Sequence, residues 1–219
     1  MLFLFISCKQ PETVIIAEDP ETAAGQEPAS SDTLSAAQRA DFRQLIVGEI
    51  NQIQTLDPLF AENSSSRRAI LQLFEGLVQY NSRGEVVPSI ARRWNISGDS
   101  LTYRFTLRND VFFHDSNIFS SGIGRKVVAR DFKFVFERMA ESAIPTNAAF
   151  IFMGIEGFNP YFREQHQVYL RQNRELEGVT GVQAPDDTTL VFELVSKDPH
   201  FLQKLASPYG VVYPRQAVS

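Results

Sequence analysis

The stretch that most constrains the fold covers residues 84–115 and contains a strict alternation of apolar and polar side chains. In residues 101–107 every second position is Leu, Tyr or Phe, and the positions between them are Thr or Arg. This period of two predicts a β-strand with one buried and one exposed face. Turn signals flank it, Gly98-Asp99 before and Arg108-Asn109-Asp110 after. Because a second apolar run, residues 111–113, follows the later turn, we expect the two runs to form a β-hairpin.

Further helices and strands follow from the spacing of apolar residues elsewhere. Helical spacing predicts helices over residues 69–78, from Pro88 through Trp94, over residues 131–139, and from Pro199 through Leu205. Ser64 to Ser66 are available to cap the first of these, and Trp94 is expected to anchor the core. Short apolar runs predict strands over residues 45–50, 86–87, 178–183 and 188–194. The chain should therefore have a mixed α/β fold.

Composition excludes several functional classes. A chain of 219 residues with 43% hydrophobic residues can form a sizeable core. A net charge of -5, with no basic run interleaved with aromatic residues, argues against nucleic acid as a partner. A single Cys excludes an intrachain disulfide and a cysteine-based zinc site.

No catalytic or metal-binding motif stands out. The sequence has no Gly-x-Ser-x-Gly elbow, no P-loop and no His-Glu-x-x-His. Asp186-Asp187 lies in a turn signal, and Gly122-Ile123-Gly124 lacks the third glycine of a dinucleotide fingerprint. We interpret His114-Asp115 as structural, since the other two histidines lie in unrelated contexts. We expect no enzyme activity, no metal site and no cofactor.

The first residues resemble a bacterial lipoprotein signal. An apolar run over residues 1–6 is followed by Ser7-Cys8, so Cys8 would be acylated and become the mature N-terminus. The run is short and lacks a basic start, which predicts a truncated signal over residues 1–8. A buried strand with an incidental Cys is the alternative. Residues 9–41 have no aromatic residue and an excess of acidic residues, so residues 9–42 are expected to form a disordered tether.

Several short segments, taken in order, resemble one family. They are Leu56-Asp57-Pro58, Phe74-Glu75-Gly76-Leu77, Val87-Pro88-Ser89-Ile90-Ala91, Trp94, Ser97-Gly98-Asp99, Leu101-Thr102-Tyr103-Arg104-Phe105, Phe113-His114-Asp115, Ala129-Arg130-Asp131-Phe132, and Thr189-Leu190-Val191-Phe192-Glu193-Leu194. In this order they are similar to solute-binding protein family 5, the extracytoplasmic receptors of peptide, oligopeptide and nickel ABC importers. The resemblance covers roughly residues 46–218.

The resemblance implies an architecture. It places the chain in a two-lobed, type II periplasmic-binding-protein-like fold, with residues 43–57 as the first strand of ligand-facing lobe I. Residues 58–206 would form the mixed α+β accessory domain of that lobe, and residues 207–219 would return into lobe I. Family members are much longer than 219 residues, so the chain is expected to represent their N-terminal portion.

The resemblance also implies a function. The receptor captures peptides or a related small solute outside the cytoplasmic membrane and delivers them to an ABC permease. It would act as a monomer without a cofactor, held to the membrane by lipid on Cys8, in the periplasm or at the cell surface. Glu49 and Asn51 are the candidate cleft-facing groups, and a strand-end carboxylate and amide in water are the alternative. Because most groups that clamp a peptide would lie beyond Ser219, we expect the 219-residue chain alone to bind peptide weakly or not at all.

Other functional classes stay open at this stage. A lipid-anchored structural or interaction domain without import activity would account for the same signal and the same core. A secreted hydrolase would need a catalytic site built from residues that form no recognisable motif. Within the receptor class, the residues do not distinguish peptide, nickel and sugar ligands.

Overall fold

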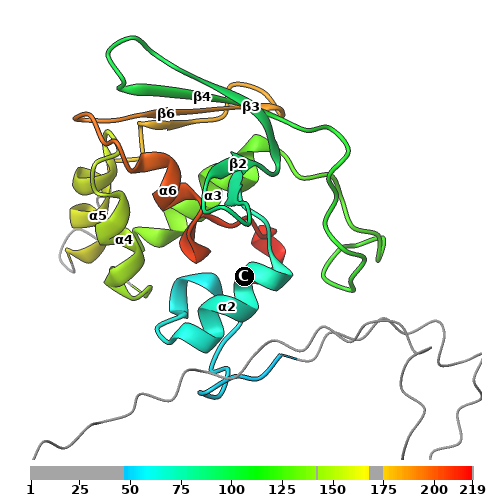
Figure 1. The fold of residues 1–219 in the computed structure, drawn as a ribbon. Coiled ribbons are helices and arrows are strands. Elements are labelled where there is room, and N and C mark those ends of the chain that lie inside the picture. The colour runs from blue at the N-terminus through cyan, green and yellow to red at the C-terminus, as the bar shows by residue number, and fades with distance from the viewer. Residues whose placement is uncertain (1–46, 142, 168–174, 219) are drawn as a thin grey trace, which may run out of the picture. The chain divides into compact units, whose positions relative to one another are not determined.

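The computed structural model describes residues 47–141, 143–167 and 175–218, and the chain divides into two units at residue 50. The second unit contains nearly all of the described residues and is the subject of the following paragraphs (Figure 1). Its helices are η1 (Pro58–Phe60), α2 (Ser64–Leu73), α3 (Ala129–Met139), α4 (Thr146–Phe152), α5 (Phe158–His166), α6 (Phe201–Leu205), η3 (Pro208–Gly210) and η4 (Arg215–Ala217). Its strands are β1 (Val78–Tyr80), β2 (Val86–Pro88), β3 (Ala91–Ile96), β4 (Thr102–Leu107), β5 (Val182–Gln183) and β6 (Thr189–Glu193). The prediction of a mixed α/β fold is confirmed.

A four-stranded antiparallel sheet in the order β3-β4-β6-β5 forms the upper layer in Figure 1. The predicted alternation in β4 is confirmed, because Tyr103, Phe105 and Leu107 are buried while Arg104 is exposed. Phe105 lies opposite Leu190 of β6, and the ring of Phe105 meets Phe192 edge to face with centroids 5.8 Å apart. The apolar face of β4 is therefore the centre of the core.

The hairpin predicted between β4 and residues 111–113 is wrong. The strand preceding β4 is β3, and the two are joined by a turn in which the Asp99 carboxylate accepts the Leu101 N–H at 3.1 Å. With β3 on one edge and β6 on the other, β4 has no free edge for residues 111–113. Phe112 instead forms an isolated bridge with Lys126.

The helix predicted from Pro88 through Trp94 is also wrong, because these residues form the end of β2, a bend and the start of β3. Pro88 ends β2, and Trp94 lies opposite Phe105 in the β3–β4 ladder. Pairing with the strongly patterned β4 overrides a short helical spacing, which is a weak signal by itself. Trp94 is half-buried and packs against Phe105 at a centroid distance of 6.2 Å, so it lies at the margin of the core.

Helix α3 packs against the sheet, as its spacing predicts. Phe132, Val135, Phe136 and Met139 are all buried. The ring of Phe136 lies 5.0 Å from the ring of Phe192 on β6, which fixes the helix against the middle of the sheet.

Helix α2 begins and ends earlier than predicted. Asn63, not a serine, caps it by accepting the Ser66 N–H at 2.7 Å, and Phe74 leaves the helix with extended backbone angles. The apolar residues that follow, Leu77 and Val78, are buried outside the helix because β1 pairs with β2 there. The predicted strand over residues 45–50 is absent from its described part, residues 47–50, where no ladder partner supports a strand.

The last third of the unit contains both confirmed and unexpected elements. Strand β6 and helix α6 confirm the predictions for residues 188–194 and 199–205, whereas the strand predicted over residues 178–183 forms only at its end, as β5. Residues 143–161 show no clean period, yet they form α4 and the start of α5, with Gly157 at a φ of 71° directly before α5. Residues 209–213 are buried, with η3 and a single Gly76–Val211 bridge in place of a regular strand. The signal at residues 1–8 and the tether at 9–42 lie outside the described residues.

Phe136→Ala should lower the free energy of unfolding by about 3–5 kcal/mol, because it leaves a cavity between α3, α4 and β6. Urea unfolding followed by circular dichroism measures the change. Phe112→Ala is the matched control, since that ring is 59% exposed and its loss should cost no more than about 0.5 kcal/mol. Equal losses in the two variants would contradict this assignment of the core.

Candidate ligand-binding site

The two predicted ligand residues lie on or beside a segment without regular secondary structure. Glu49 is half-buried and Asn51 is exposed, and residues 51–56 adopt neither helix nor strand. The sequence predicted a strand that ends at the ligand cleft, but the segment is irregular. The role of Glu49 and Asn51 in ligand binding stays a prediction.

Serine side chains of α2 hold this segment by its backbone. The Ser66 hydroxyl oxygen accepts the Gln54 N–H at 3.0 Å and the Thr55 N–H at 3.5 Å. The Ser65 hydroxyl oxygen accepts the Asn51 N–H at 3.4 Å. Both serines are completely buried. The sequence predicted that Ser64 to Ser66 cap the helix. It did not predict that two of these serines bind the backbone of residues 51–55.

An ion pair fixes the end of the same segment. Arg138, at the end of α3, donates two hydrogen bonds to the Asp57 carboxylate, at 3.0 Å and 2.6 Å. Arg138 also donates to the Tyr213 hydroxyl at 2.9 Å and lies over the Tyr213 ring. A bidentate pair of this kind has a defined geometry as well as a favourable energy. Three segments that are far apart in the sequence therefore meet at one guanidinium group.

The electrostatics of this cluster favour a charged Arg138 and a neutral Tyr213. Burial lowers the pKa of Arg138, but the hydrogen bond to Asp57 and the contact with Tyr213 more than reverse this, so the pKa lies above its ordinary value. Burial raises the pKa of Tyr213 to about 12. Both side chains thus keep one protonation state through the neutral range, which suits a structural role.

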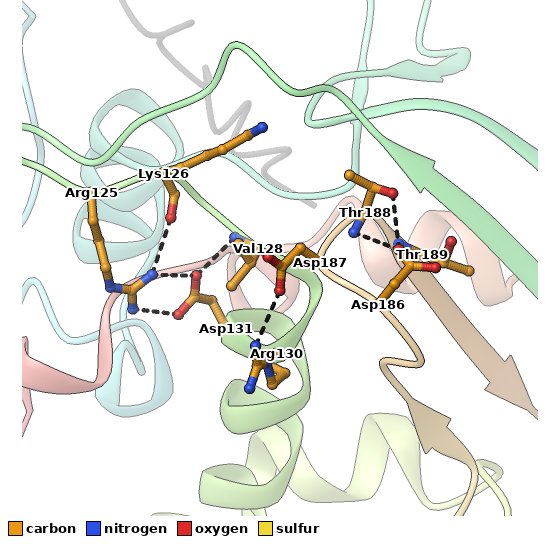
Figure 2. Close-up of polar contacts among 9 residues, drawn as sticks. All are labelled: Arg125, Lys126, Val128, Arg130, Asp131, Asp186, Asp187, Thr188 and Thr189. Atoms are coloured by element: carbon orange, nitrogen blue, oxygen red, sulfur yellow. Dashed lines mark hydrogen bonds and ion pairs between the residues drawn. The ribbon is translucent and has the colours of Figure 1, made fainter.

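A second polar cluster surrounds the start of α3 and is drawn in Figure 2. Asp131 accepts from Arg125 at 2.8 Å and from the Val128 N–H at 2.9 Å, which caps the helix as a first-turn carboxylate should. The hydrogen bond from Arg125 to the Lys126 carbonyl, at 3.1 Å, completes the arrangement. The pKa of Arg125 is raised, chiefly by its hydrogen bond to Asp131. The sequence predicted Asp131 in the first turn but not its arginine partner.

The paired carboxylates Asp186-Asp187 form a turn, as predicted. Asp186 accepts the N–H groups of Thr188 and Thr189, both at 2.8 Å, and the backbone bond to Thr188 is the largest cause of its lowered pKa. Asp187 forms an exposed ion pair with Arg130 at 3.2 Å (Figure 2). The hydrogen bonds of Asp186 and the ion pair of Asp187 account for the positions of both carboxylates without a catalytic role.

Two pockets open on the described surface. One, of about 320 Å³, lies at the start of α3 and has a basic lining, with Arg125, Arg130 and Arg215 around Asp131 and Phe134. The other, of about 290 Å³, is largely apolar and lies between α2, the loop after β4 and the final segment of the chain. Phe74, Phe112, Phe113, Phe119 and Tyr213 are among its lining residues. Neither pocket contains Glu49 or Asn51.

The His114-Asp115 step has a structural explanation. The Asp115 carboxylate accepts the Gly124 N–H at 2.8 Å and closes the loop over residues 116–124. A Cβ atom at Gly124 would lie within 1.7 Å of the Phe113 carbonyl oxygen, so this glycine permits a close approach of two backbones. Among the described residues no group of three or more His, Cys, Asp or Glu could hold a metal ion.

None of the helices within residues 47–141, 143–167 and 175–218 has the length and apolar character needed to cross a bilayer.

Known proteins similar to this chain are solute receptors. The dipeptide-binding protein DppE of Bacillus subtilis is 25% identical over 185 residues, covering 84% of this chain and 31% of DppE. YgiS of Escherichia coli, named a probable deoxycholate-binding periplasmic protein, is 29% identical over 169 residues, covering 75% of this chain and 28% of YgiS. The chain therefore spans about a third or less of the length of these relatives.

Solved structures agree with this class. The substrate-binding domain of an oligopeptide ABC transporter from Bacillus anthracis matches with a TM-score of 0.63 and 27% identity, covering 78% of this chain and 30% of that one. The described unit has the fold of the matching part of the two-lobed periplasmic binding proteins, the architecture predicted. The family model described as "Bacterial extracellular solute-binding proteins, family 5 Middle" matches residues 85–217, and the chain belongs to this family.

Arg138→Met should lower the free energy of unfolding by about 3 kcal/mol, because it leaves the Asp57 carboxylate without its cation. This is the lower end for a broken buried pair, since Asp57 is 23% exposed. The matched control is Arg130→Met, which removes an exposed pair and should cost less than about 1 kcal/mol.

Chemical denaturation of a third variant tests whether the uncompensated charge of Asp57 causes this loss of stability. Arg138→Met combined with Asp57→Asn should be more stable than Arg138→Met alone, because no uncompensated charge remains. If the single and double variants have the same stability, the ion pair is not the source of the effect.

Proposed function

We propose that this chain is the ligand-capturing component, or part of it, of an ABC importer for peptides. The observation that carries the proposal is membership of solute-binding protein family 5 together with similarity to DppE, a protein named for dipeptide binding. The related structure from Bacillus anthracis belongs to an oligopeptide transporter. These relatives are named as binding proteins, which also fits a function without catalysis. Delivery to a permease in the cytoplasmic membrane follows from the same membership.

Peptide is preferred over the other ligand classes for a chemical reason as well. Residues 51–54 are exposed and carry three carboxamide side chains, those of Asn51, Gln52 and Gln54. A carboxamide both donates and accepts hydrogen bonds, as a peptide backbone does. The similarity to YgiS makes a steroid acid such as deoxycholate the second candidate, and the apolar pocket beside α2 would suit it.

The place of action proposed is the periplasm or the cell surface. The support is the family, whose name describes extracellular binding proteins. Lipid on Cys8 would hold the protein at the membrane, and the resemblance implies that it acts as a monomer. A lipid-anchored interaction domain without import activity is the alternative, and it would be lipidated but would bind no peptide.

Calorimetric titration with mixed di- to pentapeptides tests the receptor assignment. The polypeptide encoded by the complete reading frame should bind with a micromolar or tighter dissociation constant. The 219-residue chain should give little or no saturable heat, because it spans only about a third of its relatives. Failure of the complete polypeptide to bind any peptide would contradict the function, and titration with deoxycholate would then decide between the two candidates. Saturable micromolar binding by the 219-residue chain would contradict the expectation about its missing contacts.

Metabolic labelling with a fatty acid tests the anchor. Wild-type protein expressed in a bacterium should incorporate label and sediment with membranes, and Cys8→Ser should do neither. Ser7→Ala is the matched control, because it keeps a small residue before the cysteine and should retain the label. Equal labelling of wild type and Cys8→Ser, or none in either, would contradict lipidation at Cys8.

A further inference from the structure

Residues 51–55 have no regular secondary structure, and side chains at the start of α2 hold their backbone. Three of their backbone N–H groups donate to the hydroxyls of Ser65 and Ser66, as described above. In addition, the Asn63 side-chain amide donates to the Gln52 carbonyl oxygen at 3.1 Å. Four backbone groups of this segment are thus bound by side chains at the start of α2.

Asn63 performs two tasks with the two ends of one carboxamide. Its oxygen accepts the Ser66 N–H and caps α2, while its nitrogen holds Gln52. Because Asn63 caps α2, the buried hydroxyl of Ser66 can accept hydrogen bonds from Gln54 and Thr55. A segment without regular backbone hydrogen bonds is ordinarily mobile, and these contacts restrict it.

The far end of the segment is fixed independently. Asp57 is clamped by Arg138, and its N–H donates to the Thr55 hydroxyl at 3.0 Å. The backbone is therefore anchored at both ends, while the side chains of residues 51–54 stay exposed. Fixing a recognition segment before the ligand arrives reduces the entropy lost on binding.

We propose that Asn63 and Ser66 are positioning residues for ligand capture: they hold residues 51–55 so that the carboxamides of Asn51, Gln52 and Gln54 meet the backbone of an extended peptide. This inference rests on the proposed function for its ligand. The structural part of the inference, that Asn63 and Ser66 restrain the backbone of residues 51–55, does not depend on any ligand.

Amide hydrogen exchange on the 219-residue chain tests the hold directly. Ser66→Ala should speed the exchange of the Gln54 and Thr55 amides by about tenfold, the effect of losing one hydrogen bond, and leave amides of β4 unchanged. Ser64→Ala is the matched control, because Ser64 is an exposed serine in the same helical turn and should change neither amide. Unchanged exchange at Gln54 in Ser66→Ala would overturn the inference.

Asn63→Asp separates positioning from helix stability. Aspartate caps a helix as well as asparagine does, so α2 and the thermal midpoint should be preserved. A carboxylate cannot donate to the Gln52 carbonyl, so the segment should still loosen. A merely structural role for Asn63 would predict no change in this variant.

The ligand half is measured by peptide titration of the polypeptide from the complete reading frame. Ser66→Ala and Asn63→Asp should each weaken the dissociation constant about tenfold, and Ser64→Ala should leave it unchanged. Faster exchange with unaltered affinity would overturn the positioning role. If the parent protein binds no peptide, the proposed function and the ligand half fail together, while the exchange result still decides whether these residues hold the segment.

Discussion

The arrangement of the described unit depends on the ion pair between Arg138 and Asp57. It joins residues 81 positions apart, and the hydrogen bond from Arg138 to Tyr213 adds a segment 75 positions further along. Replacing a buried ion pair with apolar groups can be neutral for stability, whereas breaking it is costly, so its value lies in fixing one arrangement. At this point the segment that enters the unit and the segment that ends it are fixed to the same helix.

Helix α3 connects the core to the candidate site, because it contacts the sheet on one face and Asp57 through Arg138. Its apolar face packs Phe136 against the sheet, and two residues later Arg138 reaches out to Asp57. Because the helix cannot shift without breaking the Phe136 contacts, the position of Asp57 is set by the sheet. The irregular segment from Asn51 is thus located by the same core that β4 and β6 build.

Local patterns predicted local structure, and partners far along the chain decided the rest. The alternation in β4 and the spacing in α3 each contain enough periodic residues to identify the element. Residues 88–94 follow a helical spacing for only two turns, and their pairing with β4 is decided by geometry that no local pattern encodes. The candidate site shows the same limit: Glu49 and Asn51 came from a resemblance, while Ser66 holds Gln54 from 12 positions away and leaves no periodic trace. An apolar run with a serine-rich helix start after it is the only signal that could have suggested this contact.

The acidic residues in the segments that carry the family resemblance explain why those segments identify the fold and not the ligand. Asp57 caps η1 and binds Arg138, Asp131 caps α3, and Asp115 closes a loop at Gly124. Each is used by the framework, so relatives named for dipeptides and for deoxycholate can share it. The carboxamide-bearing stretch before Asp57 lies between these motifs with its side chains exposed, which is why we propose it as a ligand contact. A framework that fixes the backbone of this stretch while leaving its side chains free lets their identity change without cost to the fold.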